Sequence, residues 1–365
     1  MKGTGKAAVY TGPGKPMEIR EFPLPEVEPG AILVRITLGN ICGSDLHAWR
    51  GGHRPGTEPR ILGHEMTGRV AELGQGVSMD SQGKPLAVGD RIVYSYFLPC
   101  GRCPHCLKGL RAVCLDKLPS WHNSAKEPPY FNGAYAEYYY IRPGLAVFKV
   151  PDDLTDDMVA PINCALSEVM YGLHLTGITV GDTVVIQGAG GLGIYATAVA
   201  RDMGAGKIIV IDQHDARLKL AKEFGADEVV DMKEFQTPRD RVRRVRELVG
   251  GRGGEVVVEV VGSPQAVPEG INMTDAGGTY LWIGNIVRGQ TVEVDPSLVI
   301  GASRKIIGVA TYEPWVLPRA LDFMSRNKQR FPFHKLLSHK FKLEQINEAF
   351  QASHEGKVTR AAITP

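Results

Sequence analysis

The feature that most constrains the fold is a glycine-rich turn, VVIQGAGGLG at residues 184–193, which lies between an apolar run and a helical pattern. Gly188, Gly190 and Gly193 have the spacing G-x-G-x-x-G, and a second apolar run ends at Asp212, about 20 residues further on. Such glycines allow a tight turn, close approach of a pyrophosphate to backbone N–H groups, and close packing of helix on strand. The stretch therefore predicts a strand, a phosphate-binding turn, a helix and a second parallel strand.

The acidic residue at the end of the second strand indicates which dinucleotide this turn would bind. The Asp212 carboxylate can accept hydrogen bonds from both ribose hydroxyls of NAD, whereas the 2′-phosphate of NADP would meet a like charge. Gly191 and Leu192 complete the turn. A turn that needs glycine only for its conformation would not require the flanking strands and helix. We therefore expect an NAD site, with NAD favoured over NADP.

Further strand signals follow this unit, with helical patterns such as residues 216–226 between them. The alternation predicts an α/β fold with a doubly wound parallel sheet. The uncharged stretch 183–200 has the length of a membrane span, but its glycines and polar residues favour a buried strand followed by a helix. The basic stretch 238–254 is interpreted as a solvated helix face, because the net charge is only +2. The expected strands lie at residues 227–231, 255–262, 277–284 and 304–309.

Four of the six cysteines lie close together, with the spacing C-x2-C-x2-C-x7-C. Four thiolates at such spacing can close a tetrahedral structural zinc site, although an iron–sulfur cluster or disulfides are alternatives. The N-terminal residues lack a signal-peptide pattern, so we expect a cytoplasmic protein in which thiols stay reduced. A zinc site is therefore favoured, and its ligands would be Cys100, Cys103, Cys106 and Cys114.

A second metal site is predicted from residues far apart in the sequence. Cys42 follows an apolar strand pattern, His64 lies in the turn LGHE, and Cys164 precedes a helical pattern. One histidine and two cysteines with an open fourth position form a known catalytic zinc set. Each residue alone is weak evidence, since a lone buried cysteine is usually a small apolar residue. The prediction therefore rests on the three together.

Together these motifs resemble the zinc-dependent alcohol dehydrogenases of the medium-chain dehydrogenase/reductase superfamily, over nearly the whole chain. The resemblance implies a GroES-like, mainly β catalytic domain at residues 1–160, which carries a structural zinc lobe at about 95–118. A Rossmann NAD-binding domain would span 161–305, and residues 306–365 would return to the catalytic domain. The implied catalytic zinc ligands are Cys42, His64 and Cys164, so the chain would hold two zinc ions.

The resemblance also assigns roles to residues around these sites. Asp45 would orient the zinc-bound histidine, and Glu65 would approach the metal. Ser44 would hydrogen-bond the substrate oxygen, and His47 would end a proton relay through the nicotinamide ribose. The implied contacts to NAD beyond the glycine turn and Asp212 come from Arg217 near the adenosine ribose, Arg360 on the pyrophosphate, and the backbone at Ile283 and Val309.

Several features depart from the family pattern. Gly43 occupies a position where members often carry a basic pyrophosphate ligand, which suggests looser NAD binding. Residues 76–90 resemble an insertion. Glu168 lies one helical turn after Cys164 and is a rival third zinc ligand, because a polyol dehydrogenase branch uses glutamate there. We favour the cysteine, a softer ligand for zinc.

The predicted function is the reversible, NAD-linked oxidation of an alcohol, expected to be secondary, cyclic or aromatic. Trp49, Tyr96, Trp121 and the aromatic loop 121–140 are candidate pocket walls. The alternatives are a polyol or sugar-alcohol dehydrogenase and a non-catalytic NAD-binding protein. Nucleic-acid and membrane partners are not expected. A homodimer or homotetramer is expected, with pairing near residues 299–309.

Overall fold

The computed structural model describes residues 2–52, 58–119, 123–284 and 289–365. The chain forms two compact units. The first comprises Met1–Cys164, Glu313–Lys328 and Phe333–Pro365, and the second comprises Ala165–Tyr312 and Gln329–Pro332. A return of the C-terminal segment to the first unit was expected from residue 306, and in the structure it begins at Glu313.

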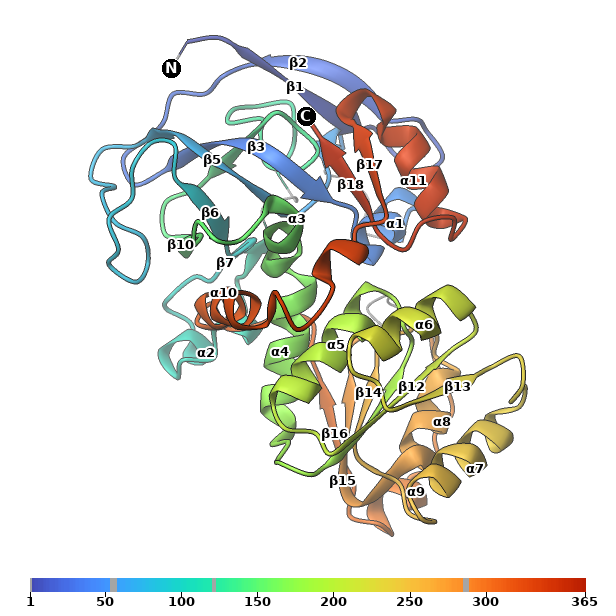
Figure 1. Cartoon of the computed structure of the whole chain (residues 1–365). Coiled ribbons are helices and arrows are strands. Elements are labelled where there is room, and N and C mark those ends of the chain that lie inside the picture. Colours follow the sequence, from blue (N-terminus) through green and yellow to red (C-terminus); the bar gives the residue numbers. More distant parts are fainter. Residues whose placement is uncertain (1, 53–57, 120–122, 285–288) are drawn as a thin grey trace. The chain divides into compact units, whose positions relative to one another are not determined.

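The second unit contains a six-stranded, fully parallel sheet (Figure 1). Its strand order, β13-β12-β11-β14-β15-β16, reverses between β11 and β14, where doubly wound folds form their ligand crevice. Apolar β-branched residues dominate these strands, because both faces of the sheet are covered by helices. The strands are β11 (Thr183–Gln187), β12 (Lys207–Asp212), β13 (Glu228–Asp231), β14 (Gly254–Glu259), β15 (Thr274–Trp282) and β16 (Lys305–Gly308).

Helices cover both faces of this sheet, which confirms the predicted doubly wound fold. Helix α5 packs on β11 and β12, whereas α8 packs on β14 and β15. The uncharged stretch 183–200 is β11 followed by α5, and no helix in the described residues is long and apolar enough to cross a bilayer. The helices are α4 (Ala165–Thr176), α5 (Gly191–Asp202), α6 (Asp215–Glu223), α7 (Pro238–Leu248), α8 (Ala266–Met273) and α9 (Ser297–Ile300).

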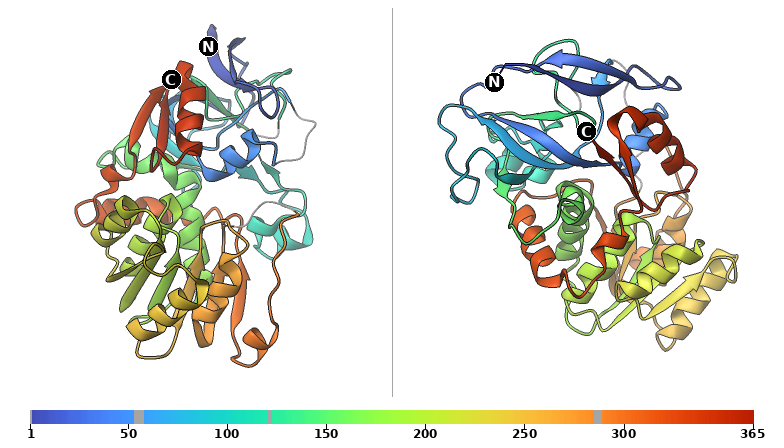
Figure 2. Two further views of the ribbon diagram at one scale, coloured as in Figure 1. Left: turned by 90° about the vertical axis from the view of Figure 1, so that its right-hand side faces the viewer. Right: turned by 45° about the horizontal axis from the view of Figure 1, so that its top comes forward.

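The first unit is mainly β, and its C-terminal segment completes its largest sheet. Strand β18 (Ala361–Thr364) pairs with the end of β3 (Ile32–Asn40), so that Ala362 lies opposite Asn40. Figure 2 shows this red segment, with β17 (His339–Lys342) and α11 (Ile346–His354), beside the blue N-terminal part of the same unit. Outside the cysteine lobe, the other strands of this unit are β1 (Thr4–Tyr10), β2 (Glu18–Pro23), β4 (Arg60–Ile61), β5 (Glu65–Leu73), β6 (Arg91–Tyr94), β9 (Tyr138–Ile141) and β10 (Val147–Lys149).

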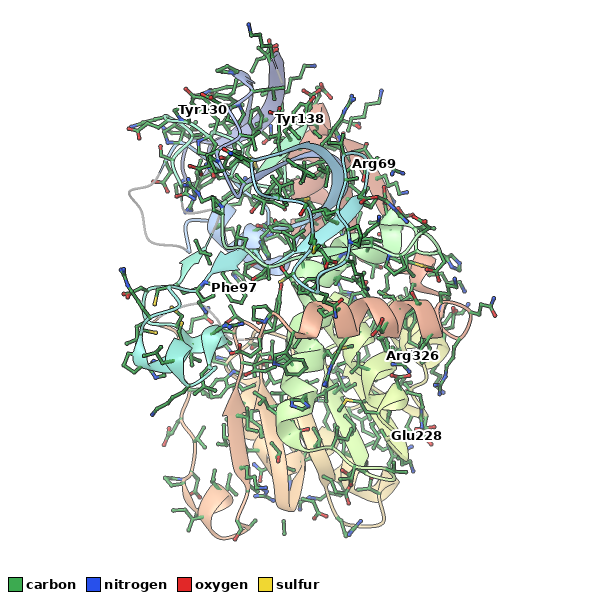
Figure 3. The ribbon with its side chains drawn as sticks, turned by 90° about the vertical axis from the view of Figure 1, so that its left-hand side faces the viewer. Arg69, Phe97, Tyr130, Tyr138, Glu228 and Arg326 are labelled. Carbon is green, nitrogen blue, oxygen red and sulfur yellow. The ribbon has the colours of Figure 1, made fainter. Side chains whose placement is uncertain are left out.

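A small lobe of the first unit carries the four clustered cysteines. Strands β7 (Phe97–Leu98) and β8 (Leu118–Pro119) pair at its base, and Phe97 is labelled in Figure 3. Between them lie α2 (Pro104–Leu107) and a short 3-10 turn. The other helices of this unit are α1 (Gly43–Trp49), α3 (Asp156–Val159) and α10 (Val316–Asn327).

Candidate metal centres and dinucleotide site

The four clustered cysteines converge as the sequence predicts. Their sulfur atoms lie within 4.8 Å of one another, and all four side chains are free thiols. The chain wraps around them: the Cys103 N–H donates to the Cys100 sulfur at 3.3 Å, and the Cys100 N–H donates to the Cys114 sulfur at 3.2 Å. Backbone N–H groups that point at sulfur stabilise thiolates, so the geometry fits a closed, structural zinc site.

The electrostatics of this lobe favour a bound cation. Backbone N–H groups of Cys106 and Leu115 lower the pKa of Cys103 to about 6. Burial, together with the neighbouring thiols, raises the pKa of Cys106 to about 12. Four sulfurs this close cannot all ionise without a compensating charge, and a divalent metal supplies it.

A second cluster unites residues from three distant segments of the first unit. The Cys42, His64, Glu65 and Cys164 ligand atoms lie within 4.8 Å of one another, and all four residues are buried. Cys42 is the N-cap of α1, and the adjacent pair His64 and Glu65 stands where β5 begins. The cluster confirms that the three predicted ligands meet; it includes Glu65 and not Glu168, the rival ligand.

Asn163 holds the third segment in place. This buried residue precedes Cys164 and accepts a hydrogen bond from the Tyr94 N–H at 3.1 Å. Its side-chain amide also donates to the Met66 carbonyl. Asn163 therefore ties the segment before α4 to β5 and β6, which brings Cys164 beside the metal-binding turn.

The Asp45 carboxylate lies behind the metal ligands. Its Oδ1 is 3.4 Å from His64 Nδ1, and its Oδ2 accepts the Cys42 N–H at 2.9 Å. Burial opposes a charge on His64, but the Asp45 carboxylate overcomes this and raises the pKa of His64 well above its ordinary value. The interaction orients the ring so that Nε2 is available to a metal, as carboxylates behind metal-bound histidines do.

Glu65 has an unexpected partner. The buried Arg360 guanidinium, which the family resemblance assigns to a pyrophosphate, donates a hydrogen bond to the Glu65 carboxylate. Burial raises the pKa of Glu65 to about 7, although Arg360 opposes this shift. The role of Arg360 in cofactor binding thus stays a prediction, and its observed role is to balance a carboxylate beside the metal ligands.

The two predicted proton-relay residues lie on the same short helix. Ser44 stands in the first turn of α1 and His47 in its last turn, and both are partly exposed. Burial, and then the positive charge of Arg50, lowers the pKa of His47. A neutral imidazole at physiological pH can accept a proton, which the end of such a relay requires.

The glycine turn has the geometry that its sequence predicts. Gly188 adopts a φ of 102°, in the region that favours glycine. A Cβ on Gly193 would lie 1.8 Å from the Gly188 carbonyl oxygen, so only glycine lets α5 pack this closely on β11. No atom of the described residues lies within 4 Å of a Cβ placed on Gly190, the N-cap of α5, so these residues leave space at the helix N-terminus for a phosphate.

Of the other predicted cofactor residues in the second unit, Asp212, Ile283 and Val309 stand at the carboxyl ends of strands, whereas Arg217 lies on α6. Asp212 accepts backbone N–H groups of Ala189 at 2.7 Å and of His214 at 2.9 Å, which links the glycine turn to the segment after β12. Arg217 is partly exposed on α6. Ile283 follows β15 and Val309 follows β16, and both N–H groups are bonded to backbone carbonyls. Their contacts with NAD stay predictions.

Two residues important to these sites were missed from sequence. Tyr135 donates a hydrogen bond to Asp45, and burial together with that carboxylate raises its pKa well above the ordinary value. Glu259 is fully buried and accepts N–H groups from Val261 and Gly262 at 2.7 Å and from Gly284 at 3.1 Å. A glutamate inside a valine run was a usable signal for Glu259; Tyr135 had none, because it lies among many tyrosines.

The predicted pocket residues differ in their surroundings. The Tyr96 ring meets the His64 ring edge-on, with centroids 5.0 Å apart, so it lies beside the metal ligands. Trp49 packs against the Phe350 and His354 rings of α11. Trp121 lies outside the described residues.

Comparison with known proteins agrees with this arrangement. Residues 28–152 match the family model described as alcohol dehydrogenase GroES-like domain, and residues 191–326 match the model described as zinc-binding dehydrogenase. The chain is 34% identical to 5-exo-hydroxycamphor dehydrogenase of Pseudomonas putida, over 95% of each chain. It is 29% identical to L-threonine 3-dehydrogenase of Thermococcus kodakarensis, over 99% of this chain and 98% of that one. The crystal structure of an alcohol dehydrogenase from Thermotoga maritima superposes with a TM-score of 0.94, at 29% identity and 99% coverage of each chain.

Proposed function

The chain belongs to the zinc-dependent alcohol dehydrogenases of the medium-chain dehydrogenase/reductase superfamily, and from this premise we propose that it oxidises a secondary or cyclic alcohol with NAD. The observation that carries the proposal is the buried group of Cys42, His64 and Cys164. Two thiols and one imidazole are a donor set that suits zinc, and three protein ligands leave a position for substrate. A bound zinc would polarise the alcohol oxygen and favour loss of its proton.

The protein's own residues then have defined tasks. Ser44, in the first turn of α1, would accept the hydroxyl proton of the substrate while it passes its own proton on through the nicotinamide ribose hydroxyls. His47, whose pKa is lowered by burial and Arg50, would receive the proton and release it to solvent. Asp45 keeps His64 oriented throughout. These roles follow from the family pattern and fit the arrangement along α1.

NAD would bind at the crevice where the strand order reverses. The open N-terminus of α5 at Gly190 would receive the pyrophosphate, and Asp212 would accept hydrogen bonds from the ribose. Three backbone N–H groups hold this carboxylate in place at the end of β12, where the 2′-phosphate of NADP would meet a like charge. NAD supplies the hydride acceptor.

The substrate class is supported by two observations. A relative is named for 5-exo-hydroxycamphor, a ring compound that carries a hydroxyl group. The aromatic Tyr96 ring lies against His64, so an apolar surface borders the metal ligands. A second candidate is a small polar alcohol, because another relative is named for L-threonine. The two candidate substrate classes differ in the group that surrounds the reacting alcohol, which is an apolar ring in the first and a polar substituent in the second.

We propose a homo-oligomer that pairs through the edge strand β16. Ile306 on this strand is 43% exposed, and Ile300 just before it is 77% exposed. Exposed apolar residues on an open sheet edge are typical of a surface that another strand covers. A cytoplasmic location would keep the zinc-binding thiols reduced.

Metal analysis and NADH formation on an alcohol panel test the proposal. The panel would contain cyclic, secondary, benzylic and polyol substrates and L-threonine, each assayed with NAD and with NADP. Two zinc ions per chain, preference for a cyclic or secondary alcohol, and turnover about a hundredfold lower in Ser44→Ala are expected. One zinc and no turnover would overturn it; preference for L-threonine or a polyol would favour the polar candidate.

A further inference from the structure

We propose that Tyr135 is a positioning residue of the catalytic metal centre, whose hydroxyl fixes the Asp45 carboxylate and thereby holds His64 and Cys42 in place for the metal. The inference rests on the catalytic zinc site proposed above. Tyr135 is fully buried and lies in the loop that leads to β9. Tyr138, the first residue of β9, is labelled in Figure 3.

The hydroxyl completes the hydrogen bonding of one carboxylate. Tyr135 Oη lies 2.7 Å from Asp45 Oδ2, the same oxygen that accepts the Cys42 N–H at 2.9 Å. The other oxygen of Asp45 faces His64 Nδ1. The carboxylate thus has a fixed donor on the Tyr135 side, and it cannot rotate away from His64 without losing that bond.

The ring of Tyr135 is itself rigidly placed against the turn that carries His64. The backbone N–H of Tyr135 donates to the Leu62 carbonyl at 3.2 Å, and the Tyr135 ring packs edge-on against the Phe350 ring. Gly63, with φ of 93°, has no side chain, and a Cβ there would lie 3.0 Å from Tyr135 Cζ. The glycine of the LGHE turn therefore makes room for this ring beside His64.

Only the hydroxyl distinguishes this tyrosine from a phenylalanine of the same shape. A phenylalanine would keep the packing on Gly63 and Phe350 but would lose the bond to Asp45 Oδ2 at 2.7 Å and the longer bond to the Asn40 carbonyl at 3.3 Å. Among the described residues, Oδ2 would then keep the Cys42 N–H as its donor. The carboxylate would gain rotational freedom, and the orientation of His64 would be less fixed. Loss of groups behind a metal ligand typically costs about 10- to 100-fold in metal affinity or activity.

The test compares Tyr135→Phe with a matched control in the full-length, zinc-loaded protein. Tyr10→Phe removes a hydroxyl from the same buried cluster, but this hydroxyl donates to the Ala48 carbonyl and not to a carboxylate. Zinc release to a chromophoric chelator is followed for both sites, and the visible spectrum is recorded after Co(II) replaces the catalytic zinc. We expect Tyr135→Phe to release the catalytic zinc about tenfold faster, with an altered cobalt spectrum.

Tyr10→Phe should match the wild type in both measurements, and the structural zinc should be released at one rate in all three proteins. Equal zinc release and equal cobalt spectra in Tyr135→Phe and Tyr10→Phe would overturn the inference. In an Asp45→Asn background, Tyr135→Phe should not speed release of the catalytic zinc any further. If the two substitutions instead multiplied the release rate independently, the inference would also be overturned. A wild-type chain that binds only one zinc would instead refute the proposed function, so the two failures are distinguishable.

Discussion

His47 shows how one side chain acquires its chemistry from its neighbours. It lies in the last turn of α1 and is partly buried, and Arg50 follows within the same helix end. Burial and the nearby positive charge both disfavour the protonated imidazole, so the pKa of His47 is lowered. The residue is therefore in the form that can accept a proton under physiological conditions.

This environment predicts the pH dependence of alcohol oxidation. Protonated His47 cannot accept the substrate proton, so kcat should decline only below the ordinary histidine pKa of 6.5. Arg50→Gln removes one of the two causes that lower the pKa of His47, so the decline of kcat should move to higher pH. The pH profile of kcat would be measured for the wild type, Arg50→Gln and His47→Gln. Arg20→Gln, an exposed arginine change in the same unit, is the control and should leave the profile unchanged. A profile unmoved by Arg50→Gln would contradict the assignment.

At the scale of elements, the turn after β11 depends on glycine, whereas the loop after β14 depends on a buried carboxylate. The glycine turn needs close packing at Gly193 and open space at Gly190. The loops after β14 and β15 are instead tied together by the buried Glu259 carboxylate, which accepts backbone N–H groups from both. The buried carboxylate thereby satisfies backbone donors that would otherwise lack an acceptor.

The two glycines should respond differently to alanine. Gly190→Ala has room for its methyl group, so we expect normal thermal stability with NAD affinity reduced about tenfold or more. Gly193→Ala would place its Cβ against the Gly188 carbonyl, so the folded state should lose about 1–3 kcal/mol. Thermal unfolding and NADH fluorescence titration measure the two effects. Equal stability of both variants would show that α5 can shift away from the turn.

Glu259→Gln should affect both stability and NAD binding. The amide cannot accept hydrogen bonds at both of its atoms. With its NH2 group toward Val261 and Gly262, these two N–H groups lose their acceptor; with the NH2 group toward Gly284, that N–H keeps only the Glu259 backbone carbonyl at 3.2 Å. An unsatisfied buried donor costs about 1–3 kcal/mol. We also expect weaker NAD binding, because Gly284 adjoins Ile283. Glu234→Gln, an exposed change in the same unit, serves as the control. If Glu259→Gln kept the stability and the NAD affinity of the wild type, Glu259 would not be needed to hold these loops.

At the scale of the whole molecule, both metal sites belong to the first unit although their ligands are organised differently. The lobe cysteines are close in sequence, whereas the proposed catalytic ligands come from segments near residues 42, 64 and 164. The C-terminal segment supports the second arrangement, since Arg360 precedes β18 and pairs with Glu65. One metal site is therefore local and the other depends on the complete unit.

Zinc content should reveal this division. Cys106→Ser should lose the lobe zinc and make residues 95–118 sensitive to proteolysis, while the catalytic zinc is retained. His64→Ala should lose the catalytic zinc and all turnover, but resist proteolysis in the lobe like the wild type. Metal analysis with limited proteolysis would check both variants. Loss of both metals from His64→Ala would indicate that the two sites are coupled.

Sequence by itself determined the features that depend on local spacing. The glycine turn, its flanking strand and helix, and the four-cysteine lobe are contiguous segments, in which a few residues and their intervals dictate backbone geometry. The set Cys42, His64 and Cys164 was predicted from its residue types, and the family resemblance supported it, because no local pattern connects the three.

Tertiary structure alone decided which buried polar groups meet. The Glu65 carboxylate, rather than that of Glu168, lies beside the three predicted metal ligands. Arg360 pairs with Glu65, and Tyr135 donates to Asp45. These pairings link residues far apart in the chain, and their energies come from burial, where an unpaired charge or hydroxyl is costly. A sequence lists such groups, but only the packed chain determines which partner each one finds.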